Sequence, residues 1–379
     1  MEIKKFENNK EVFIKEIESC KQFFSKGKSL RNCTLQDIDF SKLEVNWKKY
    51  NITNTTFLGC KLNEEDETYL RRKGAIIFPE PPSLPYQPFR KSLYQWQELM
   101  EGFSTKKDDS IDYQIYRHFS KSKFNPSINE ALWQRIHDHA MDDALRELIQ
   151  PNKDGMTEKK CVGFMGGHST LRTDEFYTKT ALAAKLLTEA GYFIVSGGGP
   201  GIMEATNLGA YFAKKSNKKL LDAITMLQKA PHFTHQNFHT QAVKVLEKYP
   251  KGAESLAIPT WFYGHEPSNL FASHIAKYFS NSIREDTLLA ISLYGIVCSP
   301  GSAGTTQEIF MDATQNHYCT FNYYSPMVFL GKKRYEIDTM IFPLLKQLSF
   351  GKEYHDLLFL SDEPKEILDF LQKNPPIKK

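Results

Sequence analysis

The chain has 379 residues, 41% hydrophobic and 25% charged, a composition that predicts a folded protein with one sizeable core and an accessory region. Lys and Arg number 49 against 45 for Asp and Glu, a balance too even to favour a nucleic-acid or membrane partner. No apolar run approaches the roughly 18–20 residues of a membrane span, and the N-terminal residues lack a signal peptide's apolar core. We therefore expect a cytoplasmic protein.

A faint five-residue repeat runs through residues 28–62, within an N-terminal accessory region that we take as residues 1–78. Its positions, with one slip, are Leu30, Leu35, Phe40, Val45, Tyr50, Ile52, Phe57 and Leu62. A five-residue period resembles a pentapeptide-repeat β-solenoid, in which each short face adds one layer to a stacked core. An irregular β-rich cap is the alternative, and neither interpretation implies any chemistry.

Residues 79–156 are expected to connect this region to the main domain. Five prolines between positions 79 and 88 predict an extended linker or arm. Residues 127–150 follow as a helix that begins with a capping box of Ser127 and Glu130. The sequence thus predicts a Pro-rich linker and a helical arm.

Strands and helices alternate from residue 157 to 379. A strand over 161–167 precedes a helix over 173–190, and a strand over 192–195 precedes a glycine loop and a second helix. Strands separated by helices imply a parallel sheet with ligands at the C-terminal ends of its strands. We therefore predict an α/β fold, a Rossmann-like doubly wound parallel sheet.

Residues 214–254 interrupt this alternation as an insertion with two expected helices. His232, His235 and His239 lie between those helices, but no Asp, Glu or Cys accompanies them as a further ligand, which disfavours a metal site. We favour a lid or an oligomer contact for the insertion and expect no metal.

The alternation returns after the insertion and continues to the C-terminus. The expected strands are 255–259, 274–279, 295–298, 326–331 and 357–361, and the expected helices are 282–293, 305–315, 338–347 and 364–373. Both glycine loops of the domain follow buried strands, which is where the ligand crevice of such a sheet lies.

The stretch from 295 to 315 is predicted to form a strand, a tight loop and a helix. Pro300, Gly301 and Gly304 end the strand, and Thr305 begins the helix. A helix start offers unpaired N–H groups and the positive end of the dipole, so a glycine-rich loop there favours an anion, most often phosphate. Glu308 lies about one turn further on, where it would meet the group that carries the phosphate. The alternative is a solvated first-turn carboxylate.

Other cofactor chemistry finds no support in either glycine loop. Neither has the GxGxxG spacing with an acid about twenty residues later that binds a dinucleotide, and no P-loop occurs. Neither contains a lysine for a Schiff base with pyridoxal phosphate. We therefore expect no cofactor.

Three motifs of the main domain occur together in a known family. They are GGHS at 166–169, GGGPGIME at 197–204 and PGSAGTTQE at 300–308. Their order and spacing resemble the LOG (Lonely Guy) family, often labelled possible lysine decarboxylases, and the motifs look most like the bacterial pyrimidine/purine nucleotide 5'-monophosphate nucleosidases. The resemblance covers about residues 160–330.

The resemblance implies an enzyme that hydrolyses the N-glycosidic bond of a nucleoside 5'-monophosphate to free base and ribose 5-phosphate, usually as a homodimer or higher homo-oligomer. Carried to this sequence, it makes Glu308 and Arg284 the catalytic residues. The substrate-binding residues that it implies are Gly301, Ser302, Ala303, Gly304, Thr305, Gly198, Gly199, Gly201, Met203 and Glu204, and we add His168 and Ser169 as residues that could touch the ligand. Arg284 lies sixteen residues before Pro300, so its assignment assumes a slip of one residue.

The expected chemistry agrees with these roles. Breaking the C1'–N bond builds oxocarbenium charge on the ribose, which an ionised carboxylate beside the sugar stabilises while it orients or deprotonates water. We assign that role to Glu308 and assistance with the phosphate or the departing base to Arg284. Glu204 either holds ribose hydroxyls or is a first-turn acid of its own helix.

One departure from the family pattern favours a different function. Ser302 replaces the middle glycine of PGGxGT, and at a positive φ a serine would cost about 1 kcal/mol, although its hydroxyl could instead bind phosphate. Together with the slip at Arg284, this leaves an alternative, a non-catalytic nucleotide-binding sensor or regulatory protein on the same fold.

Overall fold

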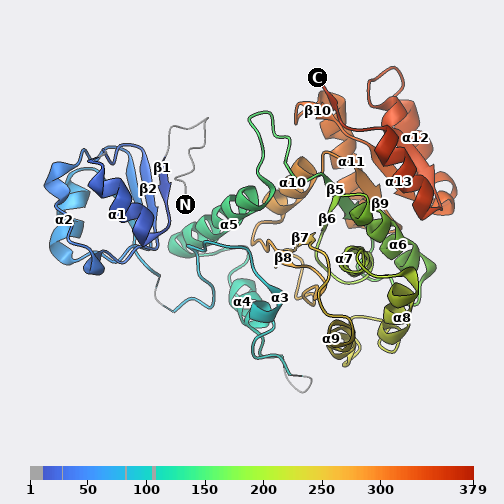
Figure 1. Cartoon of the computed structure of the whole chain (residues 1–379), viewed down its shortest axis with the longest axis horizontal. Coiled ribbons are helices and arrows are strands. Elements are labelled where there is room, and N and C mark those ends of the chain that lie inside the picture. Colours follow the sequence, from blue (N-terminus) through green and yellow to red (C-terminus); the bar gives the residue numbers. More distant parts are fainter. Residues whose placement is uncertain (1–11, 28, 82, 105–107) are drawn as a thin grey trace. The chain divides into compact units, whose positions relative to one another are not determined.

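A computed structural model describes residues 12–27, 29–81, 83–104 and 108–379 of the chain (Figure 1). It divides into two compact units, one formed by residues 1–91 and 128–140 and the other by residues 92–127 and 141–379. Helix α5 (Ile128–Ile149) contributes residues to both. This helix lies where the capping box predicted one.

The first unit is built on a parallel sheet in the order β1-β2-β3-β4. Its strands are β1 (Val12–Ile14), β2 (Cys33–Gln36), β3 (Thr55–Leu58) and β4 (Ile76–Phe78), with helices α1 (Ile17–Ser25) and α2 (Glu64–Arg72) and 3-10 turns at Phe40–Lys42 and Trp47–Lys49. Paired residues are 21 apart between β1 and β2, 22 between β2 and β3 and 20 between β3 and β4, as in Val12 with Cys33, Cys33 with Thr55 and Thr56 with Ile76.

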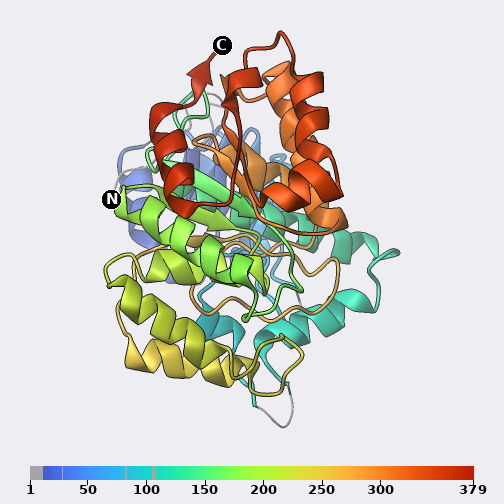
Figure 2. The same ribbon diagram turned by 90° about the vertical axis from the view of Figure 1, so that its right-hand side faces the viewer.

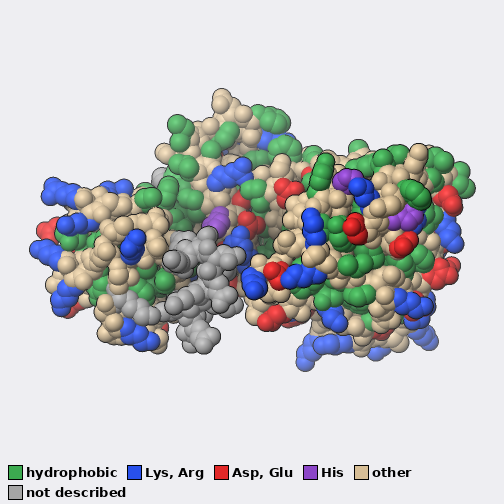
Figure 3. Space-filling model, turned by 90° about the horizontal axis from the view of Figure 1, so that it is seen from above, with side chains coloured by type: hydrophobic (Ala, Val, Ile, Leu, Met, Phe, Trp, Pro, Cys, Tyr) green, Lys and Arg blue, Asp and Glu red, His purple; other side chains and the backbone are tan. Residues whose placement is uncertain are grey.

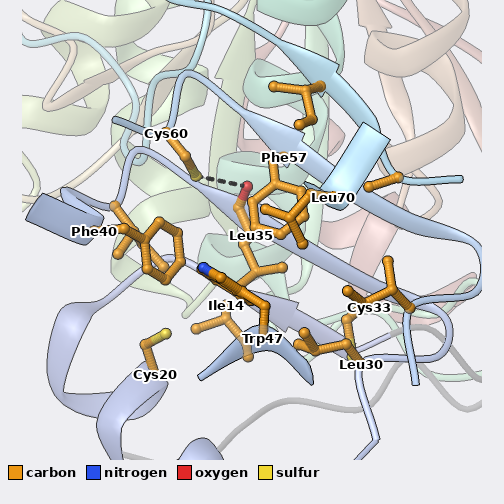
Figure 4. Close-up of a cluster of buried hydrophobic side chains, with 14 of the residues drawn as sticks. Ile14, Cys20, Leu30, Cys33, Leu35, Phe40, Trp47, Phe57, Cys60 and Leu70 are labelled. Carbon is orange, nitrogen blue, oxygen red and sulfur yellow. Dashed lines mark hydrogen bonds between the residues drawn. The ribbon is translucent and has the colours of Figure 1, made fainter. Parts of the chain in front are cut away.

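Every position of the five-residue repeat lies in, or packs against, the core of this unit. Figure 4 labels four of them, Leu30, Leu35, Phe40 and Phe57. Phe40, Trp47 and Phe57 meet edge to face there, with ring centroids 5.1–6.0 Å apart. The Cys60 thiol donates to the carbonyl of Leu35 at 3.3 Å. Burial raises the pKa of Cys60 to about 12, so this thiol stays protonated.

The second unit holds a seven-stranded sheet in the order β12-β11-β9-β5-β6-β7-β8, and all its neighbouring strands are parallel. The strands are β5 (Cys161–Met165), β6 (Phe193–Ser196), β7 (Leu256–Ala257), β8 (His274–Ile275), β9 (Ile296–Cys298), β11 (Met327–Leu330) and β12 (Leu358–Ser361). The chain enters at the central β5, proceeds outward to β8, returns to β9 and proceeds outward again. The predicted Rossmann-like doubly wound fold is confirmed, and its switch point lies between β5 and β9.

Helices cover both faces of this sheet. On one face α6 (Glu175–Glu189), α7 (Ile202–Tyr211) and α13 (Pro364–Lys373) bury Val162, Phe164, Ile194 and Val297, and Figure 2 shows α6 and α13 side by side. The other face is covered by α10 (Asn281–Ile291) and α11 (Ala303–Tyr318). Ser292, the C-cap residue of α10, packs on Gly163. Gly163 permits this contact because a Cβ there would meet the Ser292 Oγ at 2.5 Å.

The insertion forms the two expected helices, α8 (Asn217–Leu227) and α9 (Phe238–Lys248), whose apolar sides pack with those of α6 and α7. The arm between residues 92 and 127 contains α3 (Trp96–Leu99) and α4 (Ile111–Ser120), which the sequence did not predict. The remaining elements are a π-helical turn (Lys333–Asp338), α12 (Ile341–Leu348), a 3-10 turn (His355–Leu357), and β10 (Tyr323–Tyr324) paired antiparallel with β13 (Ile377–Lys378).

The surface carries both signs of charge close together. On the face of the second unit turned to the viewer in Figure 3, Lys and Arg side chains alternate with Asp and Glu side chains. Among the helices that the structure describes, none has the length and apolar character needed to cross a bilayer.

Candidate functional site

A cleft of about 120 Å³ opens at the switch point, beyond the C-terminal ends of β5, β6 and β9. This is where an open α/β sheet binds its ligands. Its lining residues are Phe164, Met165, Gly166, Gly167, His168, Gly197, Met203, Pro259, Thr260, Tyr263, Gly264, Glu266, Arg284, Glu285, Ser302, Gly304, Thr305 and Glu308. All three sequence motifs therefore contribute to one cleft.

Backbone hydrogen bonds join the three glycine-containing loops. Gly167 N donates to the Pro300 carbonyl at 3.0 Å, and Ile202 N donates to the Gly167 carbonyl at 3.1 Å. Gly201 has φ +66°, and a Cβ on it would meet the carbonyl of His168 at 2.7 Å. Only glycine satisfies both the backbone conformation and the close approach.

The N-terminus of α11 faces the cleft with free donors. Thr306 N makes the first bond of this helix, to the Ser302 carbonyl at 3.0 Å, so the N–H groups just before it have no partner in the helix. Ser302, Gly304 and Thr305 line the cleft. Gly301 lies behind them, where a Cβ would meet the Gly167 nitrogen at 2.9 Å. The first turn of α11 is thus available to an anion.

The strain considered for Ser302 is absent. This residue is the N-cap of α11 with φ −112° and ψ −140°, so it lies outside the left-handed region in which a side chain is strained, and its side chain is exposed. The positive φ that would have made a serine costly does not occur, because α11 begins at Ala303 and position 302 is its cap rather than part of the tight turn.

Arg284 and Glu308 form a buried ion pair within the cleft, with Nη1 3.1 Å from Oε1. The guanidinium is anchored by two further bonds, from Nε to the Ile258 carbonyl at 2.7 Å and from Nη2 to the Gly197 carbonyl at 3.2 Å. Glu308 is 9% exposed. Burial raises the pKa of Glu308 and Arg284 opposes part of that rise, which is the environment of a general base.

Two further acids flank this pair. Glu285 accepts a hydrogen bond from the Gln307 side chain at 2.7 Å, and its carboxylate lies 4.0 Å from Arg284. Asp312, one turn beyond Glu308 on α11, is 3% exposed, and burial raises its pKa to about 8. Asp312 is therefore neutral near pH 7 and adds no charge beneath the cleft.

Glu204 lies outside the lining of the cleft. Both of its carboxylate oxygens bind Arg172, at 2.5 and 2.8 Å, and Tyr177 donates a further bond at 2.8 Å. The Arg172 guanidinium also stacks 3.5 Å above the ring of Phe238. Since these partners occupy both oxygens, Glu204 joins α7 to the insertion, and the structure gives it no contact with a ligand at the cleft.

The other residues predicted for binding fall into two groups. Met203 and His168 line the cleft, and His168 lies 6.0 Å from the ring of Phe233 in the insertion. The residues that do not line the cleft are Gly198, Gly199, Gly201, Gly301, Ala303 and Ser169.

Sequence reasoning missed one wall of the cleft, the segment that follows β7. Thr260, Tyr263 and Glu266 line the cleft, whereas Trp261 and His265 point to the arm. The segment has no periodic pattern and no motif. Its only signal is its place after a predicted strand, at the edge of the sheet where ligands bind.

Asp112 on α4 holds this wall in place. It accepts bonds from Trp261 Nε1 and Ser268 Oγ, each at 2.7 Å, and forms an ion pair with Lys277 at 2.8 Å. Burial alone would favour its protonated form, but Lys277 and the hydrogen bonds keep the pKa of Asp112 below its usual value. His265 adds a contact with Asp108 at 3.0 Å.

Metal ligation finds no support in the described part of the chain, where no group of three or more His, Cys, Asp or Glu side chains is close enough to hold an ion. In the insertion, His232 contacts Thr234 at 2.8 Å, and His235 accepts from the Asn237 nitrogen at 3.1 Å.

Comparisons with known proteins connect the chain to solved structures only. No protein-family model and no curated protein matches it. It is similar to the molybdenum cofactor binding protein from the phototrophic bacterium Rippkaea orientalis, with 14% identity and a TM-score of 0.37 over 57% of this chain and 97% of that one. It is also similar to the molybdenum cofactor carrier protein MCP from Chlamydomonas reinhardtii, with 14% identity and a TM-score of 0.38 over 57% and 98%. These values carry no argument about what this chain binds, and membership of the LOG family stays a prediction.

Proposed function

We propose that this chain hydrolyses the N-glycosidic bond of a nucleoside 5'-monophosphate, releasing the free base and ribose 5-phosphate. The observation that carries the proposal is the buried pair of Arg284 and Glu308 in the same cleft as the free N-terminus of α11. An anion site and an anchored carboxylate about one helical turn apart match a phosphorylated sugar, whose reacting carbon lies a few bonds from its phosphate.

The phosphate binds the first turn of α11 in this mechanism. The N–H groups of Gly304 and Thr305 and the hydroxyl of Thr305 supply donors, and the helix dipole adds positive potential. No residue has to move a proton in this step, so the first turn contributes binding and orientation.

Glu308 acts on the ribose. As the C1'–N bond lengthens, its ionised carboxylate stabilises the oxocarbenium charge and takes the proton of the attacking water, whose oxygen bonds to C1'. Burial raises the pKa of Glu308, which suits it to that proton transfer, and the charge of Arg284 favours its ionised form. The departing base receives a proton from solvent or from a group at the open side of the cleft.

The proposal is tested by incubating the purified protein separately with AMP, GMP, IMP, CMP, UMP and N6-isopentenyl-AMP and separating the products by chromatography. Release of free base and ribose 5-phosphate supports it. The Glu308→Gln variant should then lose about 10²–10³-fold in kcat and keep its nucleotide affinity, because the charge acts mainly in the transition state. Binding of nucleotide without release would instead identify a non-catalytic nucleotide-binding protein.

A further inference from the structure

The cleft has a third carboxylate, Glu266, with no assigned role. Of the described acids that line it, Glu308 pairs with Arg284, and Glu285 accepts from Gln307. For Glu266, by contrast, neither an ion pair nor a hydrogen bond is found within the described residues. Its carboxylate is half-buried in the lining. A carboxylate in such a position is stabilised by donors that a ligand brings.

The position of Glu266 is set from two sides. Its Oε2 lies against Gly199, where a Cβ would come within 2.5 Å of it and within 2.7 Å of the Met203 Cε. From the other side, the bonds of Asp112 to Trp261 and Ser268 hold the segment that carries it. The carboxylate is therefore preorganised, which reduces the entropy lost when it binds a ligand.

The charge of Glu266 restricts what it can contact. A phosphate is excluded by repulsion, and the first turn of α11 already offers the anion site. Two neighbouring sugar hydroxyls present two donors to the two oxygens of one carboxylate.

From these contacts we infer that Glu266 binds the 2',3'-diol of the ribose, which makes the site selective for ribonucleotides over 2'-deoxyribonucleotides. The inference rests on the proposed function, because it takes a nucleoside 5'-monophosphate as the ligand. Glu266 selects the sugar, and Glu308 remains the residue that acts on the glycosidic bond.

The test compares each nucleotide with its 2'-deoxy form, using AMP with 2'-dAMP and GMP with 2'-dGMP. Dissociation constants are measured by calorimetry on the full-length protein, independently of turnover. The wild type should bind the ribonucleotide about 10–100-fold more tightly, as expected for hydrogen bonds to a charged group. In Glu266→Gln and Glu266→Ala the preference should fall below about threefold, through weaker binding of the ribonucleotide.

Two further variants separate the carboxylate from other causes. Gly199→Ala keeps the charge but displaces Glu266, and it should also reduce the preference. Asp286→Asn removes an exposed charge from α10 and should leave the preference unchanged. Equal binding of AMP and 2'-dAMP by the wild type, or a preference that survives Glu266→Ala, would overturn the inference while nucleotide binding still supports the proposed function. Failure of all the nucleotides to bind would refute the proposed function itself.

Discussion

The guanidinium of Arg284 and the carboxylate of Glu308 lie 3.1 Å apart, although they come from different helices, α10 and α11. Arg284 cannot follow Glu308 freely, because the carbonyls of Ile258 and Gly197 hold its other nitrogens. Arg284 therefore holds Oε1 of the Glu308 carboxylate in place, and Glu308 still lines the cleft.

Replacing Arg284 should change the pH dependence of activity. Arg284 lowers the pKa of Glu308 against the effect of burial, so Arg284→Met raises that pKa further. Since the ionised carboxylate is the active form, the acid limb of the kcat/KM profile moves to higher pH, and the loss of about 10–100-fold at pH 7 shrinks as the pH rises. Arg284→Lys keeps the positive charge and should shift the limb less. A profile of unchanged shape would contradict the assigned pairing.

Neighbouring positions in the loop between β9 and α11 should respond differently. Gly301→Ala places a methyl group within 2.7 Å of Thr305 Cβ and 2.9 Å of Gly167 N, which pushes the first turn of α11 out of position. Nucleotide affinity should fall by at least about tenfold, the equivalent of one lost hydrogen bond to a charged group. Ser302→Gly serves as the matched control. It should cost only a few tenths of a kcal/mol, because an N-cap tolerates glycine. Calorimetric binding and urea denaturation of both variants check the prediction.

Removing the charge of Asp112 should weaken substrate binding without contact with the substrate. Asp112→Asn leaves Lys277 buried without its counter-charge, which destabilises by about 3–5 kcal/mol and loosens the wall that carries Glu266. We expect KM to rise more than kcat falls.

A double variant separates the two effects of Asp112. Asp112→Asn with Lys277→Met removes both charges and should recover much of the stability. The high KM should persist, because an asparagine has one acceptor oxygen where Asp112 has two, so either Trp261 or Ser268 loses its acceptor. Ser349→Ala, which removes a part-buried hydrogen bond to His355 outside the cleft lining, is the control for general destabilisation. A KM that returns to the wild-type value with stability would rule out a positioning role.

Asp312 should make the protein less stable as the pH rises. Its pKa is 3.8 in a model peptide and about 8 in the fold, because burial favours the neutral form. Between these values the folded state keeps a proton that the unfolded state has lost, so stability falls by up to about 1.4 kcal/mol per pH unit. Asp312→Asn removes this dependence. Its stability relative to wild type should therefore increase from pH 5 to pH 8 in urea denaturation, whereas Asp286→Asn should show no such trend.

The loop between β9 and α11 shows what local patterns can predict. Pro300 and Gly301 end β9 and α11 follows, so the strand, the loop and the helix were predicted together. The φ of Ser302 was not, because it depends on where the first helical bond forms, and Thr306 makes that bond to Ser302 itself. The helix begins two residues before the predicted Thr305, which makes Ser302 its cap.

Long-range contacts account for the other differences. Glu204 occupies the first turn of its helix, as predicted, but the partners that decide its role, Arg172 and Tyr177, come from an earlier part of the chain. Glu266 and Asp112 carry no local signal either, since their roles arise when the arm packs on the segment after β7. Periodicity describes one element at a time, so it cannot reveal which side chains meet across elements.

The N-terminal sheet is arranged so that it can be extended by duplication. Each strand pairs with one 20–22 residues further along the chain, and all pairs are parallel. Copying one such stretch would add a strand to the sheet. The side chains of the neighbouring strands would stay on the same face of the sheet, because the copied side chains would return to the same side. The length of this region can therefore change by whole layers without altering the fold of the second unit.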